Sequence, residues 1–504
     1  MQAAACLQQT GVSQGDSVAL MVDDPVDFCR QWLGLTFIGA TMVAINTSMR
    51  GTPLTHQLSI ASVTTVIVDA NHLPTIEAID TDATILHIDK LSSTSMQKQT
   101  QPQPQAQLPE ISHTDRACIM FTSGTSGPSK GVEMPHAHCV LFAIGTIENY
   151  RLQPTDTFYN CLPLFHANGL FMQLLACLIN GTKAVIRNKF SATQWLTDIR
   201  TSGATHTNTL GAVAAFIVAQ PATADDTNHQ LRVIGAAPLT AAAEGAFRNR
   251  FNVGEVLPLY GMTEVNIPLY GKLGESAPGT CGRVYDKYFD VEIRDTNSDE
   301  PVDDNVTGEI MVRPKQPYGF MSGYVGMPEK TLEAWRNFWF HTGDAAYRNE
   351  YGQFVFVDRI KDCIRRRGEN ISSYEVEQAF LAIDDIAEAA AYAVPATGIN
   401  KRTDGNSGNS TGDRLDTRLD SRSVKTDEGM EDEVMVALMI TGNSHDWPKW
   451  MEAALVNLPA FAAPRYLRIM SDFPKTPTGK VRKVALRTEG ITTDTIDTQA
   501  NDRR

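Results

Sequence analysis

Short apolar segments alternate with segments of helical length from residue 116 onward, and this alternation limits the possible folds more than any other feature of the sequence. Residues 136–150 (HAHCVLFAIGTIENY) have the length of a helix, and Ser191 can cap a second helix, SATQWLTDIR. The apolar segments between the helices read as strands: RACIMF, DTFYNCLPLF, TKAVIR, ATHTNTL, LRVIG and EVLPLYG. Strand–helix–strand repetition at this spacing predicts an α/β fold in which parallel sheets are covered by helices.

The pattern changes after about residue 280, where short alternating strands such as VEIRD, GEIMVRP and GQFVFVDR are separated by turn residues. We expect a β-rich subdomain over about 280–360, at the end of a large N-terminal domain, residues 1–360. A smaller α+β domain is expected over 361–490, with a helix at SYEVEQAFLAI and a strand at EVMVALMI. Residues 491–504 are expected to be a disordered tail.

Two stretches have a composition typical of unstructured chain. Residues 91–114 include TQPQPQAQ, and residues 397–431 hold almost no large apolar side chain, so neither can bury enough surface to offset the entropy of ordering. The first is expected to be a surface loop, and the second an insertion in the C-terminal domain. The N-terminus opens on AAACLQQTGV, which resembles the end of a helix, so a first strand and helix are expected to be missing.

Composition excludes several classes of protein. The formal net charge of −14 argues against nucleic acid as the main partner, because a phosphate-backbone binder normally has a basic balance. The 8 cysteines are dispersed without metal-ligand or disulfide spacing, so each is interpreted as a small buried hydrophobe in a reduced, cytoplasmic protein. No apolar run reaches the ~18–20 residues that a transmembrane helix needs, and no signal peptide is evident. The oligomeric state is not indicated.

A glycine-rich loop, TSGTSGPSKG at 122–131, directly follows the apolar run ACIMF. Such a loop between a strand and a helix can present backbone N–H groups to phosphate oxygens, with hydroxyl donors and the charge of Lys130 added. It is not a Walker A motif, because Ser129 precedes the lysine and Gly131 follows it. Taken alone, the loop would be interpreted as an ordinary turn.

Four further segments accompany this loop in order: YGMTE (260–264), FHTGD (340–344), VDRIKD (357–362) followed by RRRGENISSYEVE, and PKTPTGK (474–480). The series resembles the adenylate-forming superfamily of acyl-CoA synthetases, nonribosomal adenylation domains and firefly-type luciferases. The resemblance covers nearly the whole chain. It implies that a carboxylic acid attacks the α-phosphorus of ATP, giving an acyl-adenylate and pyrophosphate, and that a thiol such as coenzyme A then takes the acyl group.

The resemblance also implies roles for individual residues in ATP binding. Lys480 and Thr263 would contact phosphate oxygens during adenylation, and Glu264 would be the magnesium-associated acid, which fits the preference of Mg²⁺ for one or two carboxylates. Asp344 and Arg359 would contact the ribose. The remaining ATP-contacting positions are Thr122, Ser123, Gly124, Thr125 and Lys130 for the phosphates, Gly235, Ala236 and Ala237 beside the adenine, and Tyr260 and Gly261, with Tyr260 stacked on the base.

The thiol-transfer step is expected to use another face of a mobile C-terminal domain, with Lys361 at the hinge. Arg367 and the segment Gly368, Glu369 and Asn370 would approach coenzyme A. Five cations fall within nine residues here, and they fit either a solvated hairpin face or attraction of phosphates: Arg359, Lys361, Arg365, Arg366 and Arg367. His166 and Asn168, in PLFHANG, would line the acyl pocket.

Within the superfamily, QPATADDTNHQLR and YFDVEIRDTNS look closest to crotonobetaine/carnitine–CoA ligases. The resemblance therefore implies an acyl-CoA synthetase of that kind or a fatty-acid–CoA ligase, with ATP, Mg²⁺ and coenzyme A as cofactors and a small carboxylic acid as substrate. Two alternatives stay open: an adenylation enzyme that loads a carrier-protein thiol, and a non-catalytic relative. Neither the chain length nor the head group of the acid follows from the sequence.

Overall fold

The structure is a computed structural model. It describes residues 1–91, 108–122, 129–237, 239–366, 369–395, 432–442, 445–456, 458–476 and 480–499. The chain forms two compact units, Met1–Phe356 and Val357–Arg504, whereas the sequence placed the division after residue 360. The predicted insertion (397–431) and most of the predicted loop at 91–114 lie outside the described residues.

The first sheet of the first unit has the strand order β16-β6-β5-β2-β1-β3-β4. Strands β5, β2, β1, β3 and β4 run parallel, and all five residues of β1 are buried, as expected of a strand covered on both faces. The strands are β1 (Ser17–Met21), β2 (Thr41–Ala44), β3 (Val63–Val68), β4 (Thr84–His87), β5 (Arg116–Thr122), β6 (Lys130–Pro135) and β16 (Gly323–Tyr324). The helices here are α1 (Gln2–Gln9), α2 (Pro25–Ile38), α3 (Gly51–Ile60), α4 (Leu73–Glu77) and the 3₁₀ helix η1 (Ile88–Leu91).

The second sheet has the order β13-β12-β11-β10-β9-β7-β8, and its strands from β11 to β8 are parallel. The strands are β7 (Thr157–Asn160), β8 (Lys183–Ile186), β9 (His206–Leu210), β10 (Val233–Ala237), β11 (Glu255–Met262), β12 (Asn266–Tyr270) and β13 (Arg283–Val284). The helices are α6 (His136–Tyr150), the π-helix η2 (Asn168–Leu175), α7 (Ala176–Asn180), α8 (Ala192–Ser202), α9 (Gly211–Val218) and α10 (Ala241–Asn249). The predicted helix at 136–150 and the α/β fold class are confirmed.

Two local predictions differ from the structure. The glycine-rich loop does not join a strand to a helix, because β5 and β6 pair antiparallel with Thr122 opposite Lys130 and so form a hairpin. Ser191 does precede α8, but its side chain makes no hydrogen bond to the helix, and its Oγ lies 3.1 Å from the Thr193 hydroxyl instead.

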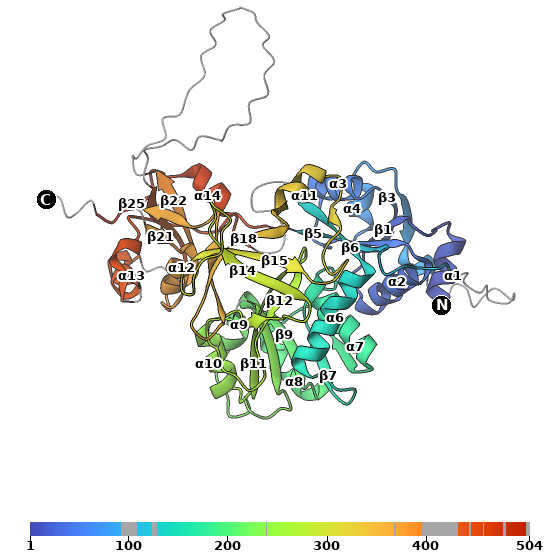
Figure 1. Cartoon of the computed structure of the whole chain (residues 1–504), viewed down its shortest axis with the longest axis horizontal. Helices are drawn as coiled ribbons and strands as arrows, with labels where there is room; N and C mark the ends of the chain where they lie inside the picture. Colours follow the sequence, from blue (N-terminus) through green and yellow to red (C-terminus); the bar gives the residue numbers. More distant parts are fainter. Residues whose placement is uncertain are drawn as a thin grey trace, which may run out of the picture. The chain divides into compact units, whose positions relative to one another are not determined.

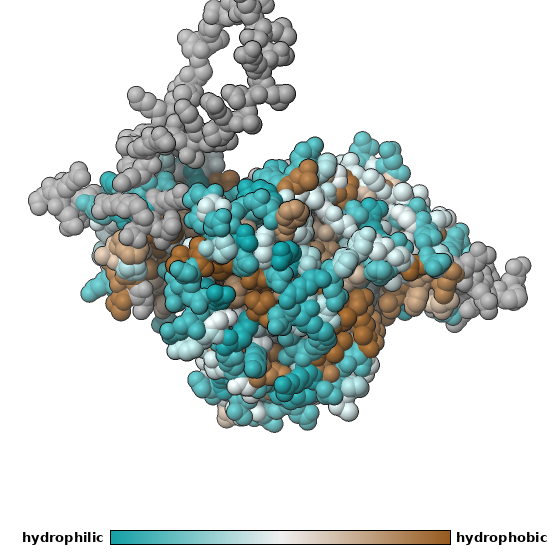
Figure 2. Space-filling model, viewed as in Figure 1, coloured by the Kyte–Doolittle hydropathy of each residue, from teal (hydrophilic) through white to brown (hydrophobic). Residues whose placement is uncertain are grey.

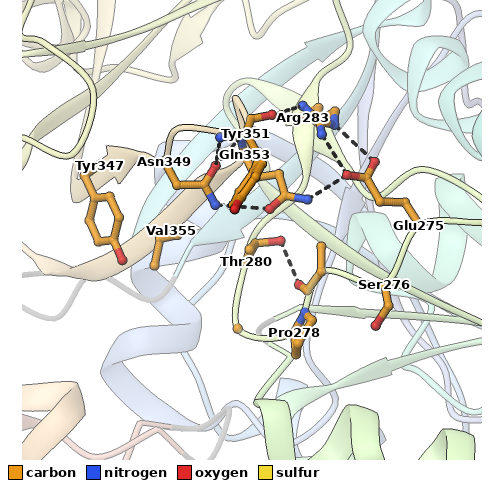
Figure 3. A pocket seen from close by; sticks show the side chains of 12 residues that line it. Glu275, Ser276, Pro278, Thr280, Arg283, Tyr347, Asn349, Tyr351, Gln353 and Val355 are labelled. Carbon is orange, nitrogen blue, oxygen red and sulfur yellow. Dashed lines mark hydrogen bonds and ion pairs between the residues drawn. The ribbon is translucent and has the colours of Figure 1, made fainter.

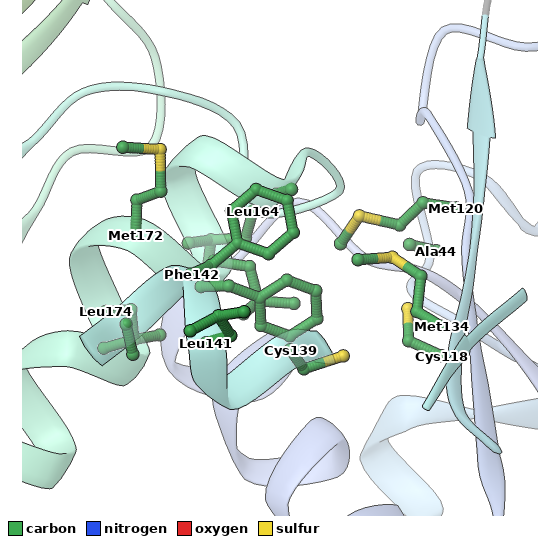
Figure 4. Packing of buried hydrophobic residues seen from close by; sticks show 14 of the residues in the cluster. Ala44, Cys118, Met120, Met134, Cys139, Leu141, Phe142, Leu164, Met172 and Leu174 are labelled. Atoms are coloured by element: carbon green, nitrogen blue, oxygen red, sulfur yellow. The ribbon is translucent and has the colours of Figure 1, made fainter. Parts of the chain in front are cut away.

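The core between the two sheets is built around α6, which packs on β5 and β6 of the first sheet and on β12 of the second (Figure 1). Figure 4 shows Cys118, Met120 and Met134 of the first sheet facing Cys139 and Phe142 of α6. These side chains are all buried. The eight cysteines are free, and five of them are buried as predicted: Cys6, Cys118, Cys139, Cys161 and Cys177. The prediction is wrong for the other three, which are half-buried: Cys29, Cys281 and Cys363.

The third sheet of the first unit confirms a β-rich region at its C-terminal end. Its strands are β14 (Phe289–Arg294), β15 (Gly308–Pro314), β17 (Trp335–Arg336), β18 (Trp339–Arg348) and β19 (Phe354–Arg359), the last of which ends in the second unit. Helix α11 (Pro328–Ala334) precedes β17. The FHTGD motif lies inside the long strand β18, so Asp344 is not a turn residue.

Phe338 lies at the tip of the β17–β18 hairpin. Its side chain is 88% exposed. Hydrophobic residues (brown) also occur among hydrophilic residues (teal) elsewhere on the surface in Figure 2. Asn337 and Phe338 have φ of +50° and +65°, the backbone of a two-residue turn that favours Asn-Gly. A side chain other than glycine is strained there, so we expect Phe338→Gly to raise the free energy of unfolding by about 0.5–1 kcal/mol.

Chemical denaturation of the Phe338 variants checks this expectation. Phe338→Ala is the matched control, because it removes the same exposed ring but keeps the Cβ atom that causes the strain. An equal gain from the alanine variant would show that the ring, and not the backbone, limits stability at this turn.

His206, on β9, is fully buried. Burial lowers the pKa of its imidazole to about 4; Asp156 opposes this shift, and Arg232 adds to it. Histidine in the unfolded chain ionises near pH 6.5, so the unfolded state binds this proton at a higher pH than the folded state. The contribution of neutral His206 to the free energy of unfolding is therefore complete above about pH 6.5 and is lost as the pH falls toward 4.

We therefore expect acidification from pH 7 to pH 4 to cost roughly 3 kcal/mol of unfolding free energy through His206 alone. Urea unfolding at several pH values tests this with His206→Gln, whose pH dependence should be shallower than that of the wild type by this amount. His113→Gln, at an exposed position, is the control. Equal pH dependence in wild type and His206→Gln would contradict the assignment.

The second unit contains a hairpin and a four-stranded sheet. The hairpin pairs β20 (Ile364–Arg366) with β21 (Glu369–Ile371), and the sheet has the order β22-β23-β24-β25. The sheet strands are β22 (Ile386–Pro395), β23 (Asp432–Ile440), β24 (Tyr466–Ile469) and β25 (Ile496–Asp497); the helices are α12 (Ser373–Leu381), α13 (Trp447–Leu455), α14 (Lys483–Glu489) and the 3₁₀ helix η3 (Ala460–Ala462). The predicted disorder from residue 491 is wrong for residues 491–499, because β25 pairs with β24 and the Thr498 hydroxyl donates to the Pro464 carbonyl.

Arg366 is neither a solvated hairpin cation nor an accessible phosphate ligand. It is 4% exposed, and its guanidinium lies 2.7 Å from the Glu433 carboxylate and donates to the carbonyls of Phe461 and Ala463. Arg465 lies 3.3 Å from the other Glu433 oxygen. One buried carboxylate thus compensates two arginines, and the sequence-based interpretation of Arg366 is corrected.

Candidate active site

Several of the predicted nucleotide-contacting residues lie at the carboxyl ends of two adjacent parallel strands. Gly235 and Ala236 of β10 pair with Leu257 and Pro258 of β11, and β11 continues into Tyr260 and Gly261. Ligands of α/β proteins bind preferentially at such strand ends. A Cβ atom at Gly235 would lie 1.7 Å from the Tyr150 hydroxyl, so only glycine fits this position.

A buried pair joins Tyr260 to Asp344. The Tyr260 hydroxyl donates to the Asp344 carboxylate at 2.7 Å, and the two residues are 8% and 4% exposed. Burial and the neighbouring carboxylate raise the pKa of the Tyr260 phenol well above its ordinary value, so it remains a donor. The structure therefore brings together two of the predicted nucleotide residues from separate sheets.

An irregularity in β18 sets the position of Asp344. The pairing of β15 with β18 shifts register between Glu309 and Met311, and Gly343 has φ of +73°. The Gly343 N–H donates to the Glu309 carboxylate at 2.8 Å, and the Thr342 hydroxyl accepts the Asp344 N–H at 3.1 Å. Specific hydrogen bonds thus hold the backbone N–H groups of Asp344 and of the glycine that precedes it.

Glu264 and Lys130 are linked through a tyrosine that sequence reasoning missed. The Tyr324 hydroxyl donates to Glu264 Oε1 at 3.0 Å, and Lys130 Nζ lies 3.9 Å from the centre of the Tyr324 ring. Glu264 is 4% exposed, so it is not a solvated helix cap. The predicted phosphate-binding lysine and the predicted magnesium-binding glutamate therefore both contact the Tyr324 side chain.

His138 supports the neighbouring Thr263, and it was also missed. Its imidazole nitrogens lie 2.8 Å from the carbonyl oxygens of Thr263 and Gly319, and the ring is fully buried. Asn266 donates to the His138 carbonyl at 3.0 Å. No spacing in the sequence could have shown these contacts, because they join α6 to segments more than a hundred residues away.

Of the proposed acyl-pocket residues, Asn168 is the first residue of the π-helix η2, and His166 lies two residues before that helix. His166 is half-buried, with its ring 4.7 Å from that of Phe165. The Asn168 side-chain oxygen accepts from Asn208 at 2.9 Å and from Gln173 at 3.0 Å. Asn208 in turn accepts from the Tyr150 hydroxyl at 2.8 Å, so Asn168 ends a buried chain of polar side chains.

Thr122 and Ala237 are the last residues of β5 and β10 in the first unit. The other predicted residues belong to the second unit or lie outside the described residues. Arg359, Lys361 and Lys480 are exposed. The Lys480 N–H donates to the Thr476 hydroxyl at 3.1 Å, and the Thr476 N–H donates to the Lys480 carbonyl at 2.7 Å, which closes the PKTPTGK loop at its base. The side chains of Glu369 and Asn370 are not described; Ser123, Gly124, Thr125, Arg367 and Gly368 lie outside the described residues.

An open cleft of about 540 Å³ lies elsewhere on the first unit, and none of the predicted site residues lines it. Figure 3 shows that its polar side chains bond to one another: Arg283 pairs with Glu275 at 2.7 Å, and Gln353 donates to the same carboxylate at 2.8 Å. Because these polar groups satisfy each other, the cleft offers little unmet bonding capacity to a ligand.

A cluster of potential metal ligands lies at the ends of β1 and β3, formed by Asp23, Asp69 and His72. His72 Nε2 lies 2.8 Å from the Asp23 carboxylate, which lowers the pKa of Asp23 against the effect of burial. The Asp69 carboxylate accepts backbone N–H groups of Asp23, Asn71 and His72. We interpret the cluster as a histidine–aspartate contact beside an aspartate turn.

Together, the strand-end site and the ordered motifs define the chain as an α/β enzyme of the nucleotide-binding class. Residues 1–325 match the family model of the AMP-binding enzymes. The chain belongs to this family, and the predicted membership in the adenylate-forming superfamily is confirmed. Among the described residues, no helix has both the length and the apolar character needed to span a membrane.

Named relatives extend the match along the chain. The sequence is 28% identical over 499 residues to a crotonobetaine/carnitine–CoA ligase of Salmonella typhi, covering 95% of this chain and 89% of that protein. It is 29% identical over 501 residues to a crotonobetaine/carnitine–CoA ligase of Escherichia coli, with the same two coverages.

Solved structures support the fold. ATP-bound MatB from Rhodopseudomonas palustris superposes with a TM-score of 0.80 at 24% identity, over 97% of this chain and 91% of that one. MenE from Bacillus subtilis, an O-succinylbenzoate coenzyme A synthetase in complex with AMP, gives a TM-score of 0.79 at 20% identity, over 96% and 91%. At these identities the likeness shows the fold alone.

Proposed function

We propose that the protein is an ATP-dependent acid–CoA ligase that forms an acyl-adenylate and then a thioester. The observation that carries this proposal is the grouping of Lys130, Tyr324 and Glu264 in the same unit as the buried Tyr260–Asp344 pair. A cation and a carboxylate held together suit the phosphates and metal ion of a nucleotide, and a buried carboxylate suits ribose hydroxyls. The CoA-ligase names of the relatives support the same class of reaction.

In the first half-reaction, an acid carboxylate forms a bond to the α-phosphorus of ATP, and the bond to pyrophosphate breaks. Both reactants are anionic, so the protein must supply charge neutralisation and alignment. Lys130, Thr122, Thr263 and the loop residues Ser123, Gly124 and Thr125 would hold the phosphates. Lys480 would contact the carboxylate and α-phosphate oxygens, and Asp344 and Arg359 would hold the ribose.

The buried Glu264 carboxylate fits a magnesium ion, because Mg²⁺ prefers oxygen ligands and generally takes one or two carboxylates from the protein. When bound, magnesium supplies neutralisation of phosphate charge. Gly235, Ala236, Ala237 and Gly261 would form the walls around the adenine, with Tyr260 against the base.

For thioester formation, we propose that a C-terminal domain beginning at residue 361 turns about Lys361. Arg367, Gly368, Glu369 and Asn370 would then meet coenzyme A, and the thiol sulfur would take the acyl group as AMP leaves. His166 and Asn168 would line the acyl pocket, and the candidate acids include betaine-type and fatty acids. The free cysteines suit the cytoplasm.

The proposal is tested by pyrophosphate release from ATP and MgCl₂ against a panel of short, medium, long and betaine-type acids. We expect release to depend on an acid, and thioester to appear when coenzyme A is added. Adenylate formation that proceeds only to a carrier-protein thiol would favour the carrier-loading alternative. Absence of ATP binding and of release with every acid would favour a non-catalytic relative.

A further inference from the structure

We propose that Tyr324 is a positioning residue that sets the orientation of Glu264 and holds Lys130 beside it before the nucleotide binds. This inference rests on the proposed function, and it adds a residue that the motifs do not assign. The Tyr324 hydroxyl donates to Glu264 Oε1 at 3.0 Å, while the Lys130 ammonium lies over its ring at 3.9 Å from the centre.

The chemistry of the phenol suits this role. Tyr324 is 6% exposed, and its hydroxyl is an O–H donor that faces an acceptor oxygen of the Glu264 carboxylate. A hydrogen bond to an ionised acceptor is stronger than a neutral one, so it can fix the plane of the carboxylate. The face of an aromatic ring attracts an ammonium ion, which restrains the flexible lysine side chain.

The backbone around Tyr324 links the same two elements. The Met321 N–H donates to the Glu264 carbonyl at 3.0 Å, and the Val325 N–H donates to the Gly131 carbonyl at 2.8 Å. Tyr324 itself pairs with Val132 where β16 joins β6. Residues 321–325 thus connect the YGMTE segment to the strand that carries Lys130, and Tyr324 supplies the side-chain part of that connection.

Two substitutions separate the two contacts. Tyr324→Phe removes the hydrogen bond to Glu264 but keeps the ring under Lys130, whereas Tyr324→Leu removes both. We expect Tyr324→Phe to raise the MgCl₂ concentration needed for half-maximal ATP binding about tenfold, with a smaller effect at saturating MgCl₂. Tyr324→Leu should in addition weaken ATP binding at saturating MgCl₂ by about three- to tenfold.

The matched control is Tyr285→Phe. The Tyr285 hydroxyl donates to the Glu148 carboxylate at 2.5 Å, and Lys287 bonds to the same carboxylate, so this variant loses a similar bond away from the predicted site. It should leave the MgCl₂ dependence unchanged. Thermal melting of each variant shows whether it is folded.

The measurement is calorimetric ATP binding to the full chain over a MgCl₂ series, followed by pyrophosphate release with an active acid. If the wild type binds ATP but Tyr324→Phe has an unchanged MgCl₂ dependence, the positioning role is refuted and the proposed function stands. If Tyr324→Leu resembles Tyr324→Phe, the role of the ring is refuted. Should Tyr324→Leu fail to fold, Tyr324→Phe decides the proposal alone. If the wild type binds no ATP, the proposed function fails, and the inference fails with it.

Discussion

Replacing Lys480 by alanine is expected to slow acyl-adenylate formation by about 10²–10³-fold, while ATP still binds. The side chain is exposed, and it lies at the end of a loop closed by two hydrogen bonds between Thr476 and Lys480. Since both bonds use only backbone atoms of Lys480, the substitution keeps them and removes the lysine side chain beyond Cβ, including its ammonium. A group that stabilises charge developing in the transition state affects the rate more than substrate binding.

Stopped-flow or radiometric pyrophosphate release, with ATP binding measured separately, tests this expectation. Lys449→Ala removes an exposed lysine from α13 of the same unit and should leave the rate unchanged. Normal adenylation by Lys480→Ala would show that the proposed role of this lysine is wrong. A parallel loss of ATP affinity would instead assign it to ground-state binding.

Replacing Glu433 by alanine is expected to lower the stability of the second unit by about 3–5 kcal/mol. The carboxylate lies between the guanidinium groups of Arg366 and Arg465, and the Glu433 and Arg366 side chains are only 7% and 5% exposed. Removing it leaves a buried cation without its counter-ion, which costs far more than the pair itself contributes.

Hydrogen exchange followed by mass spectrometry can follow this loss in β22 and β23, since it reports on the second unit separately. Protection there should fall in Glu433→Ala, while the sheets of the first unit keep theirs. Glu452→Ala, at an exposed position of α13, is the control. A loss below about 1 kcal/mol would mean that water or another group compensates the arginines.

Sequence patterns predicted the helices and strands whose own residues favour that structure. The helix at 136–150 follows from its length and apolar content, and the strands around GEIMVRP and EVMVALMI follow from their runs of apolar residues. Strand β22 was missed, because AEAAAYAV is rich in alanine, which favours helices, and only its pairing with β23 makes it a strand. Strand β25 was missed for a similar reason, since its order comes from β24.

In the candidate site, too, local sequence identified residues, whereas tertiary structure determined their contacts. The ordered motifs identified Glu264, Asp344 and Lys130, but they could not show that Tyr260 binds Asp344 or that Tyr324 joins Glu264 to Lys130. Those contacts join segments that the fold brings together over long sequence distances, and a tyrosine in the segment GYVG carries no spacing signal. Arg366 illustrates the converse, because a local cluster of cations suggested exposure where tertiary structure buries the residue.

The π-helix at 168–175 makes the chain of polar side chains around Asn168 sensitive to segment length. Gln173 reaches Asn168 across five positions, a spacing that brings side chains together in a π-helix but separates them in an ordinary α-helix. Deleting a single residue from this segment would convert the wide turns to normal ones and detach Gln173 from Asn168. Insertion or deletion of one residue in this segment is therefore a way for related enzymes to change which polar groups face Asn168, without any substitution.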